Sequence, residues 1–209
     1  MRWIAVFCVL SLAGCNGGES SPPPPPQTVA VVTMNPGNWF FQHSPNMPAS
    51  PISHPAGWSF DFPSQDGVHY LVHPAAGKVP TIMSASFSIE KTGDVKFVES
   101  EPCGEHNAKM RLYFQRRGDD LSAAKQNYRW WSIDAFQLAE AVNSISVAIQ
   151  PGNWSQVFGK SGDAMVADFF AAASDVQAVG MTFGGCFAGH GVYVTGGSAR
   201  FVATGFSVN

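Results

Sequence analysis

VQAVGMTFGGCFAGHGVYVTGGSARFVATGFSV, residues 176–208, is the stretch that decides the fold of this chain. Short runs of apolar, β-branched and aromatic residues alternate in it with glycine clusters, and glycine is what tight turns and bulges between strands require. The pattern predicts three strands, Val176–Phe183, Gly191–Val194 and Ala199–Val208. Such strands cannot bury an apolar face alone, so we expect earlier strands to pack over them.

Period-two alternation continues upstream of this stretch. In Ser144–Ile149, for example, the isoleucine and valine side chains fall on one face and the serines on the other. Turn residues such as Pro151-Gly152-Asn153 and Lys91-Thr92-Gly93-Asp94 separate many of the runs. The further expected strands are Trp58–Phe62, Val68–Val72, Thr81–Ile89, Val95–Val98, Lys109–Arg116, Tyr128–Ser132 and Ser144–Ile149. This density of strands predicts an all-β fold, an antiparallel sandwich or barrel.

One helix is expected, Asp163 to Ala173, capping one end of the sandwich. Its apolar stripe follows helical spacing, through Val166, Phe169, Phe170 and Ala173. Phe136–Val142 is ambiguous between a strand and a helical turn, and proline-rich Met34–Pro55 is expected to be irregular. The tetrapeptide PGNW occurs twice, at 36–39 and 151–154, but the flanking residues do not match, so we do not interpret it as an internal repeat.

The first fourteen residues have the layout of a secretory signal. Arg2 supplies a positive charge, Ile4–Leu12 is an apolar run too short for a permanent membrane span, and small residues follow. The ending Leu12-Ala13-Gly14-Cys15 resembles the lipobox of bacterial lipoproteins. That resemblance implies cleavage before Cys15, lipidation of its thiol with a diacylglyceryl group and N-acylation by a fatty acid such as palmitate. The alternative is an ordinary signal peptide with a chance cysteine.

A lipid anchor of several acyl chains gives stable membrane attachment. Asn16 stands at the second mature position, where enteric bacteria use aspartate to retain lipoproteins in the inner membrane, so the resemblance favours the outer membrane. Residues 15–27 are expected to form a tether. Its proline run, Pro22–Pro26, predicts an extended polyproline II spacer that holds the body off the membrane.

Residues 28–209 have about the size of a single domain. Without Arg2 the mature chain carries 11 basic and 15 acidic residues, and this acidic balance gives no reason to expect a nucleic-acid partner. The expected partners are the membrane, through the lipid, and a possible glycan.

Two cysteines remain once Cys8 leaves with the signal and Cys15 carries the lipid. In an oxidising compartment the pair Cys103 and Cys186 predicts a disulfide. It would close a loop of more than eighty residues and stabilise the fold by on the order of 4 kcal/mol in the chain-entropy model. The alternative is two unpaired buried thiols. Without a CxxC motif or clustered histidines, the two are not expected to bind a metal.

The order of motifs from Trp58 to Val208 resembles the jelly-roll β-sandwich of galactose-binding-like domains and carbohydrate-binding modules. The matching features are an early W-x-F strand, Arg111-Leu112-Tyr113-Phe114-Gln115, Tyr128-Arg129-Trp130-Trp131-Ser132, the run from Ser146 to Trp154, and the glycine-rich end. The likeness is one of layout and strand chemistry, and none of its motifs is diagnostic. It implies carbohydrate binding and, in many such sandwiches, a structural calcium ion, for which Asp61, Asp66 or Asp175 are candidates.

Candidate ligand-binding residues come from strand parity. Met110, Leu112 and Phe114 should point into the core, so Arg111, Tyr113 and Gln115 should line the opposite face. The neighbouring strand should add Tyr128 and Trp130, or Arg129 and Trp131, to that face. Sugars stack on aromatic rings and take hydrogen bonds from planar polar groups, so these residues could form a saccharide surface. The alternative is an ordinary solvated sheet face with one tryptophan partly covered by a loop.

Signals for catalysis are weak. Glu99 with Glu101, or Asp119 with Asp120, could supply one half of a glycosidase pair, but nothing places them opposite one another. Neither a GxSxG elbow nor an HExxH motif is present. The sequence therefore predicts a non-catalytic binding module at the envelope without a required cofactor. The alternatives are a structural or protein-interaction component and a polysaccharide-degrading enzyme.

Overall fold

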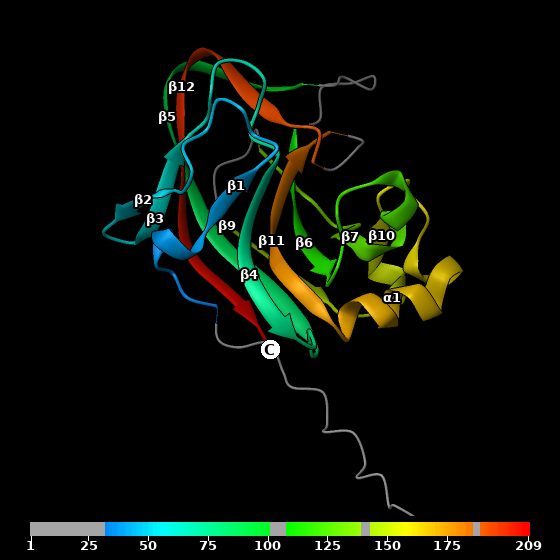
Figure 1. The fold of residues 1–209 in the computed structure, drawn as a ribbon. Helices are drawn as coiled ribbons and strands as arrows, with labels where there is room; N and C mark the ends of the chain where they lie inside the picture. Colours follow the sequence, from blue (N-terminus) through cyan, green and yellow to red (C-terminus); the bar gives the residue numbers. More distant parts are fainter. Residues whose placement is uncertain (1–31, 101–107, 139–142, 186–188) are drawn as a thin grey trace, which may run out of the picture.

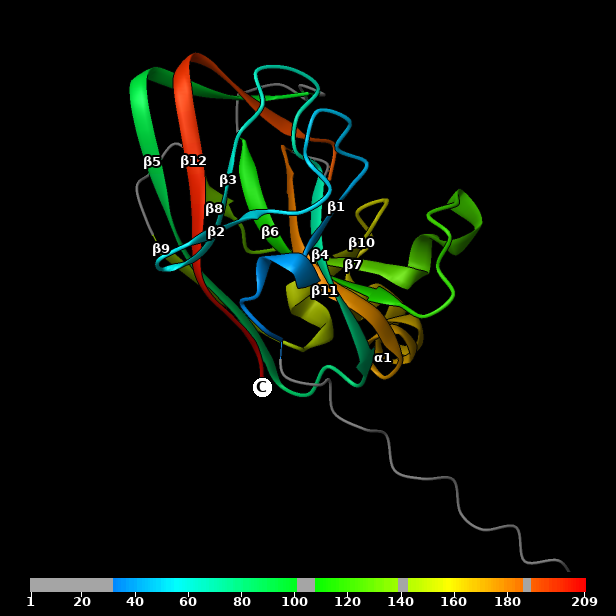
Figure 2. The same cartoon turned by 60° about the vertical axis from the view of Figure 1, so that its left-hand side comes forward.

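The computed structural model of the chain describes residues 32–100, 108–138, 143–185 and 189–209. Within these residues two antiparallel sheets enclose an apolar core, and one short α-helix lies at an end of the sandwich (Figure 1 and Figure 2). The prediction of an all-β antiparallel sandwich with one short helix is confirmed.

The first sheet contains seven strands. Its order is β1 (Phe40–Gln42), β4 (Tyr70–Gly77), β11 (Val176–Gly184), β6 (Lys109–Arg116), β7 (Arg129–Ser132) and β10 (Trp154–Gln156), with β8 (Phe136–Gln137) paired to β6. The second has the order β2 (Ile52–His54), β3 (Gly57–Asp61), β12 (Val192–Val208), β5 (Ile82–Glu99) and β9 (Asn143–Ala148). Because β3, β4, β5 and β6 alternate between the sheets, the chain crosses repeatedly from one to the other, as in Greek-key and jelly-roll sandwiches.

The stretch 176–208 supplies a central strand to each sheet. β11 lies between β4 and β6, and β12 lies between β3 and β5. Phe201 of β12 is fully buried, and its ring stacks on Phe87 and Phe60 at centroid distances of 4.8 and 5.2 Å. Phe183 of β11 meets the same ring edge-on at 5.7 Å. Aromatic burial of this kind dominates core energetics, so the C-terminal stretch joins the two sheets through its own side chains.

Two predicted interruptions are absent. The two expected strands Gly191–Val194 and Ala199–Val208 form the single strand β12, which begins at Val192, and the expected turn at Lys91–Asp94 lies inside β5. Gly93 opposes Gly197 in the ladder, with register shifts beside it. The glycines therefore act as bulges in a long bent strand pair, where the sequence had predicted turns.

The short elements also differ from expectation. The expected helix begins as the 3-10 turn η4 (Gly162–Met165) and continues as α1 (Val166–Ala173), with Ser161 as the N-cap of the turn. Met34–Pro55 is not wholly irregular, because it contains the turn η1 (Pro36–Asn38) and the edge strands β1 and β2. Two further 3-10 turns are η2 (Ala123–Tyr128) and η3 (Pro151–Asn153), and Phe136–Gln137 forms the short strand β8.

Candidate functional site

The alternation expected along β6 is confirmed. Met110, Leu112 and Phe114 are fully buried in the main core. Tyr113 lies in a second apolar cluster on the other side of the seven-stranded sheet, which we call the outer cluster and which consists of Tyr70, Val72, Tyr113, Trp131 and Ala178. The adjacent tryptophans of β7 point in opposite directions, since Trp130 belongs to the main core and Trp131 to the outer cluster.

The outer face is nevertheless covered around Tyr113. Tyr113 is 0% exposed, Gln115 3% and Trp131 5%. A saccharide therefore cannot stack on Tyr113 in this structure, and Trp131 offers only a small exposed area. Trp130 is also unavailable, because its indole is buried and donates a hydrogen bond to Asn127 O at 2.9 Å.

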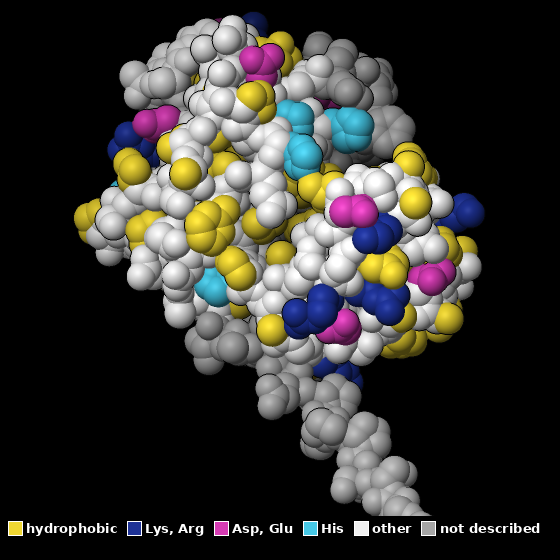
Figure 3. All heavy atoms as spheres, viewed as in Figure 1, with side chains coloured by type: hydrophobic (Ala, Val, Ile, Leu, Met, Phe, Trp, Pro, Cys, Tyr) yellow, Lys and Arg dark blue, Asp and Glu magenta, His cyan; other side chains and the backbone are white. Residues whose placement is uncertain are grey.

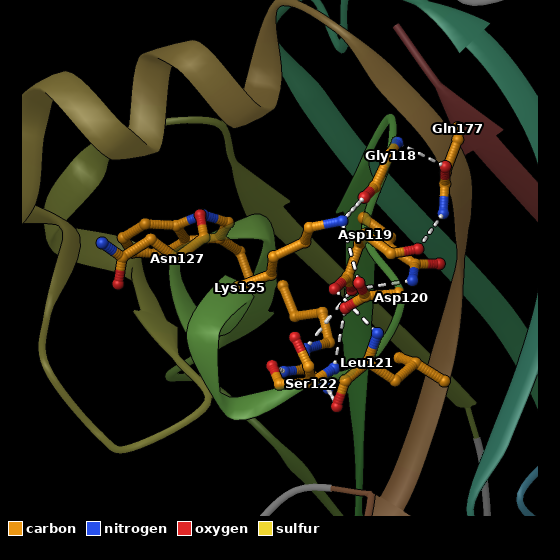
Figure 4. A network of polar contacts seen from close by, with 11 residues as sticks. Gly118, Asp119, Asp120, Leu121, Ser122, Lys125, Asn127 and Gln177 are labelled. Carbon is orange, nitrogen blue, oxygen red and sulfur yellow. Dashed lines mark hydrogen bonds and ion pairs between the residues drawn. The ribbon is translucent and has the colours of Figure 1, made fainter.

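Tyr113 and Trp131 are buried within the outer cluster, where Tyr70 packs on Tyr113, whereas Gln115 is buried by residues 117–128, which we call the covering segment. The carboxylate of Asp119 is buried and accepts hydrogen bonds from Gln115 Nε2 at 2.8 Å and from the Leu121 amide at 3.0 Å (Figure 4). The guanidinium of Arg129 lies 3.3 Å from the same carboxylate and donates to the carbonyls of Leu121 and Ser122. Gln115 and Arg129 thus hold the covering segment on the sheet.

Contacts at the rim fix the same segment. Gly118 N donates to Gln177 Oε1 at 2.9 Å, and Gln177 Nε2 donates back to Asp119 O at 3.4 Å (Figure 4). Asp120 is exposed, accepts a hydrogen bond from the Ser122 amide and forms an ion pair with Lys125 at 2.9 Å. Hydrogen bonds from Ser122 and Lys125 hold the pKa of Asp120 below its usual value. The guanidinium carbon of Arg116 lies over the ring of Tyr128, 4.6 Å from the ring centroid.

A cleft of about 300 Å³ brings two predicted residues together. Arg111 and Trp131 line it with Ile133, Ser155 and Val157, and we call it the Trp131 cleft. Arg111 donates hydrogen bonds to the carbonyls of Ser132 and Ile133, which fixes its guanidinium at the cleft wall. Burial lowers the pKa of Arg111 from its ordinary value, and nearby Asp134 opposes this effect.

A larger depression of about 970 Å³ adjoins the cleft, because Val157 lines both. We call it the histidine pocket, since His43, His69 and His190 line it together with Tyr70 and Arg129. Figure 3 shows three histidine side chains gathered on this face of the molecule. These histidines are far apart in the chain and follow no motif spacing, so the sequence alone did not identify them as a site.

Three separate loops build the pocket around His69. One ring nitrogen of His69 lies 2.9 Å from Gly189 O and the other 2.8 Å from Asp66 O. The backbone amide of His69 donates to Ser44 Oγ at 2.9 Å. Gly191 approaches the imidazole so closely that an added Cβ would lie 2.6 Å from Nε2. The imidazole therefore joins the loops that carry Asp66 and Gly189.

Backbone strain is concentrated at the same place. Among the described residues, the non-glycine positions with left-handed φ are His43 (52°), Asp66 (59°) and Leu121 (64°), and all three line the histidine pocket. This conformation is uncommon for non-glycine residues and costs roughly 1–3 kcal/mol where the surroundings impose it. Such residues cluster at binding and active sites, so their convergence makes the pocket the candidate functional site.

Tyr70 forms the pocket floor and joins it to the outer cluster. Its ring lies 5.2 Å from that of Tyr113, centroid to centroid. Burial raises the pKa of Tyr70 to about 12, with Arg129 lowering and Asp119 raising it, and burial also raises the pKa of Tyr113. Tyr113 Oη and Thr182 Oγ1 are buried without a hydrogen-bond partner on the protein, so polar groups remain unsatisfied beneath this face.

Asp119, Asp120 and the candidate calcium ligands already have nitrogen partners. Asp119 and Asp120 are engaged as described above, Glu99 is buried, and Glu101 lies outside the described residues. Asp61 pairs with Arg200, Asp175 with Arg117, and Asp66 accepts a hydrogen bond from Asn46. Within the described part of the chain, His, Cys, Asp and Glu side chains form no group of three or more suited to a metal ion.

Cys15, Cys103 and Cys186 lie outside the described residues, so the lipidation and disulfide predictions rest on sequence. No helix in the described ranges is both long and apolar enough to span a bilayer. No protein-family model, curated protein or solved structure matches the chain at a significant level.

Proposed function

We propose that the chain is a lipid-anchored binding module of the bacterial envelope whose ligand is a carbohydrate. Residues 1–14 act as the signal, Cys15 carries the lipid, and the tether to residue 27 presents the body, with the outer membrane as the favoured location. The ligand lies on the outer face of the seven-stranded sheet, in the histidine pocket and the adjoining Trp131 cleft. The observation that carries the proposal is the convergence of the three left-handed non-glycine residues on this pocket.

The lining supports a saccharide ligand. Sugars present hydroxyl groups and apolar ring faces, which planar polar side chains and aromatic rings recognise. The histidine pocket offers imidazoles and Tyr70, and the cleft offers the guanidinium of Arg111 beside the edge of Trp131. The volumes of the pocket and of the cleft, about 970 and 300 Å³, both lie within the range of roughly 300–1,000 Å³ typical of ligand pockets. Of the ligand-binding residues expected from the sequence, the proposed site therefore includes Arg111 and Trp131. The histidine pocket takes the place of the expected open platform at Tyr113.

We propose binding without turnover. A glycosidase needs two carboxyl groups facing each other across a bond, one of them free to carry a proton. Asp119 is held by Gln115, Leu121 and Arg129, and Asp120 by Ser122 and Lys125. Among the described residues Asp66 is the only acid that lines the histidine pocket, so no acid pair supports hydrolysis there.

A glycan array with the soluble chain, lacking the signal and Cys15, tests the ligand class. Binding without product release supports the module. Product release contradicts it in favour of a polysaccharide-degrading enzyme. Silence, with a protein partner recovered by cross-linking in the envelope, contradicts it in favour of a structural or protein-interaction role.

His43→Asn tests the position of the site. Asparagine tolerates the left-handed backbone of residue 43, so the change removes the imidazole with little added strain. We expect glycan binding to weaken by about tenfold or more, the loss of one good contact. His54→Asn, on edge strand β2 of the other sheet, is the matched control and should bind as the unaltered protein does. Equal glycan binding by the two variants would contradict the placement of the site in the histidine pocket.

Mass spectrometry of the membrane fraction tests the anchor independently. We expect the mature chain to begin at Cys15 and to carry a diacylglyceryl group and an N-acyl chain. A soluble product cleaved elsewhere, or an unchanged mass after Cys15→Ser, would contradict lipidation without affecting the ligand proposal.

A further inference from the structure

The helix α1 is apolar on both of its faces. Its inner face, Phe169, Ala172 and Ala173, is buried against the core. Its outer face carries Val166, 46% exposed, and Phe170, 51% exposed. The apolar stripe seen in the sequence is therefore buried only at Phe169 and Ala173. Apart from Asp168 the helix is apolar all round, and such a helix is normally enclosed, so the outer face lacks the cover that its composition calls for.

The apolar surface continues beyond the helix into a depression of about 450 Å³. Phe170 and Ala171 form one wall, and Val79, Pro80 and Ile149 form the other, with exposed Lys78 at the rim. Val79 N donates to Ala173 O at 2.8 Å, which fixes the helix end against this wall. We call the outer face of α1 with this depression the α1 face.

The α1 face lies at the end of the sandwich where the described chain begins. Thr81 N donates to Asn209 O at 2.7 Å, so the chain terminus adjoins the wall of the depression. Both ribbon views show the start of the described chain, in blue, beside the C-terminal end (Figure 1 and Figure 2). Only residues 16–31 separate that start from Cys15, a reach of about 50 Å if fully extended at roughly 3.1 Å per residue.

We propose that the α1 face docks on the lipid surface to which the chain is anchored. The inference rests on the anchor at Cys15 that we propose above. A short tether keeps the body at a high effective concentration near the bilayer, so a small apolar face suffices for docking. Phe170 and Val166 would enter the headgroup–acyl boundary, as apolar faces of interfacial helices do, and Lys78 would meet lipid phosphates. Docking would orient the sandwich by one end on the membrane.

Tryptophan quenching by brominated lipid tests this orientation. Phe170→Trp places an indole on the α1 face, and Ile52→Trp, at a side chain 53% exposed on the far edge strand β2, is the matched control. The native tryptophans among the described residues are 0–5% exposed, so they contribute a background that the unaltered protein measures. The full lipidated chain is placed in vesicles of phosphatidylethanolamine and phosphatidylglycerol brominated near the top of the acyl chains.

We expect the added fluorescence of Phe170→Trp to be mostly quenched and that of Ile52→Trp to be unaffected. Equal quenching at both positions, or at neither, would overturn the proposal. Protection of position 170 without quenching, together with a dimer in analytical ultracentrifugation, would overturn it in favour of a contact between two copies of the chain.

A second preparation separates this proposal from the anchor. Residues 16–209 with an N-terminal hexahistidine extension are held on the same vesicles by a nickel-chelating lipid, which reproduces the tether without Cys15. Quenching at position 170 in this preparation supports the α1 face even if Cys15 proves unmodified. Loss of quenching here, with intact flotation of the protein on the vesicles, contradicts docking and leaves the lipidation result untouched.

Discussion

Asp119 and Asp120 are sequence neighbours in opposite environments. The side chain of Asp119 is fully buried and faces Arg129, which is 7% exposed. Asp119→Asn removes the negative charge and leaves a buried guanidinium without its counter-charge, which costs about 3–5 kcal/mol. We expect a loss of that size in the free energy of unfolding, measured by urea denaturation, because Gln115 and the covering segment depend on the same carboxylate.

Asp120→Asn is the matched control for this prediction. Asp120 is exposed, and its ion pair with Lys125 is a surface contact, which contributes little to stability in general. We expect an almost unchanged unfolding midpoint. If both variants unfold at the same urea concentration, Asp119 does not hold the covering segment in place.

Ionisation of Tyr70 should lower the stability of the fold at alkaline pH. Burial raises its pKa to about 12, above the value near 10 of an unfolded tyrosine. Between these values the unfolded chain releases a proton that the folded chain retains, so stability is unaffected below pH ~10 and falls as pH rises toward ~12, by roughly 2–3 kcal/mol. Tyr70→Phe should reduce this fall, measured by urea unfolding at pH ~9 and ~11. The same pH dependence in both proteins would contradict the assignment.

For individual residues, the sequence predicted toward which face of the sheet a side chain points but not whether that side chain is exposed to solvent. Parity correctly separates Met110, Leu112 and Phe114 from Tyr113, because the strand period is fixed by backbone geometry. It cannot reveal that Tyr70 packs on Tyr113, or that the covering segment folds back over Gln115 and Arg129. That cover depends on Asp119 and Arg129, which are ten positions apart in sequence and meet only after β6 and β7 have paired.

In the long strand pair β5–β12, glycine clusters that are typical of turns form bulges inside continuous strands. Gly93, Gly196 and Gly197 were interpreted as turn residues, yet they lie within two continuous strands. Gly196 has φ 74°, and a Cβ there would lie 2.1 Å from Asp94 O of the paired strand. A bulge and a turn both call for glycine, so composition cannot distinguish them without knowledge of the strand partner.

Gly196→Ala tests the bulge. The left-handed backbone alone costs a non-glycine residue roughly 1–2 kcal/mol, and the contact with Asp94 O adds to it. Gly118→Ala is the control, since Gly118 has φ 79° but an added Cβ there meets nothing within 4 Å. In thermal unfolding we expect Gly196→Ala to lower stability by clearly more than Gly118→Ala. Equal losses would mean that close strand approach is unimportant at the bulge.

The two PGNW segments adopt the same local structure although their flanks differ. Each forms a 3-10 turn followed by a fully buried tryptophan, Trp39 or Trp154. Each indole donates to the carbonyl six residues earlier, Thr33 O or Ala148 O, at 2.9 Å. The flanking residues do not repeat, yet the shared tetrapeptide forms the same local motif in both places, and each copy anchors its tryptophan in the core.

For the whole molecule, alternation predicted the sandwich but not the strand order. Period-two patterns report that each strand has a buried face, and they carry no information on which strands pair. The placement of β11 between β4 and β6, and of β12 between β3 and β5, is set by long-range packing around rings such as Phe201. The histidine pocket escaped prediction for the same reason, since its loops meet only through this crossing connectivity.

That connectivity bears on the predicted disulfide between Cys103 and Cys186, which both lie outside the described residues. Ser100 N donates to Gly191 O at 3.0 Å, and Lys109 pairs with Gly184 across β6 and β11. The residues flanking the two cysteine segments are therefore adjacent on both sides. Such proximity favours a disulfide between Cys103 and Cys186.

Non-reducing peptide mapping of periplasmically produced protein should recover the Cys103 and Cys186 peptides joined. Closing a loop of this length should stabilise the fold by on the order of 4 kcal/mol, so reduction should lower the urea midpoint. The double variant Cys103→Ser/Cys186→Ser is the control, because its midpoint should match the reduced protein and ignore reductant. Recovery of both cysteines as free thiols, or a midpoint that reductant leaves unchanged in the unaltered protein, would contradict the bond.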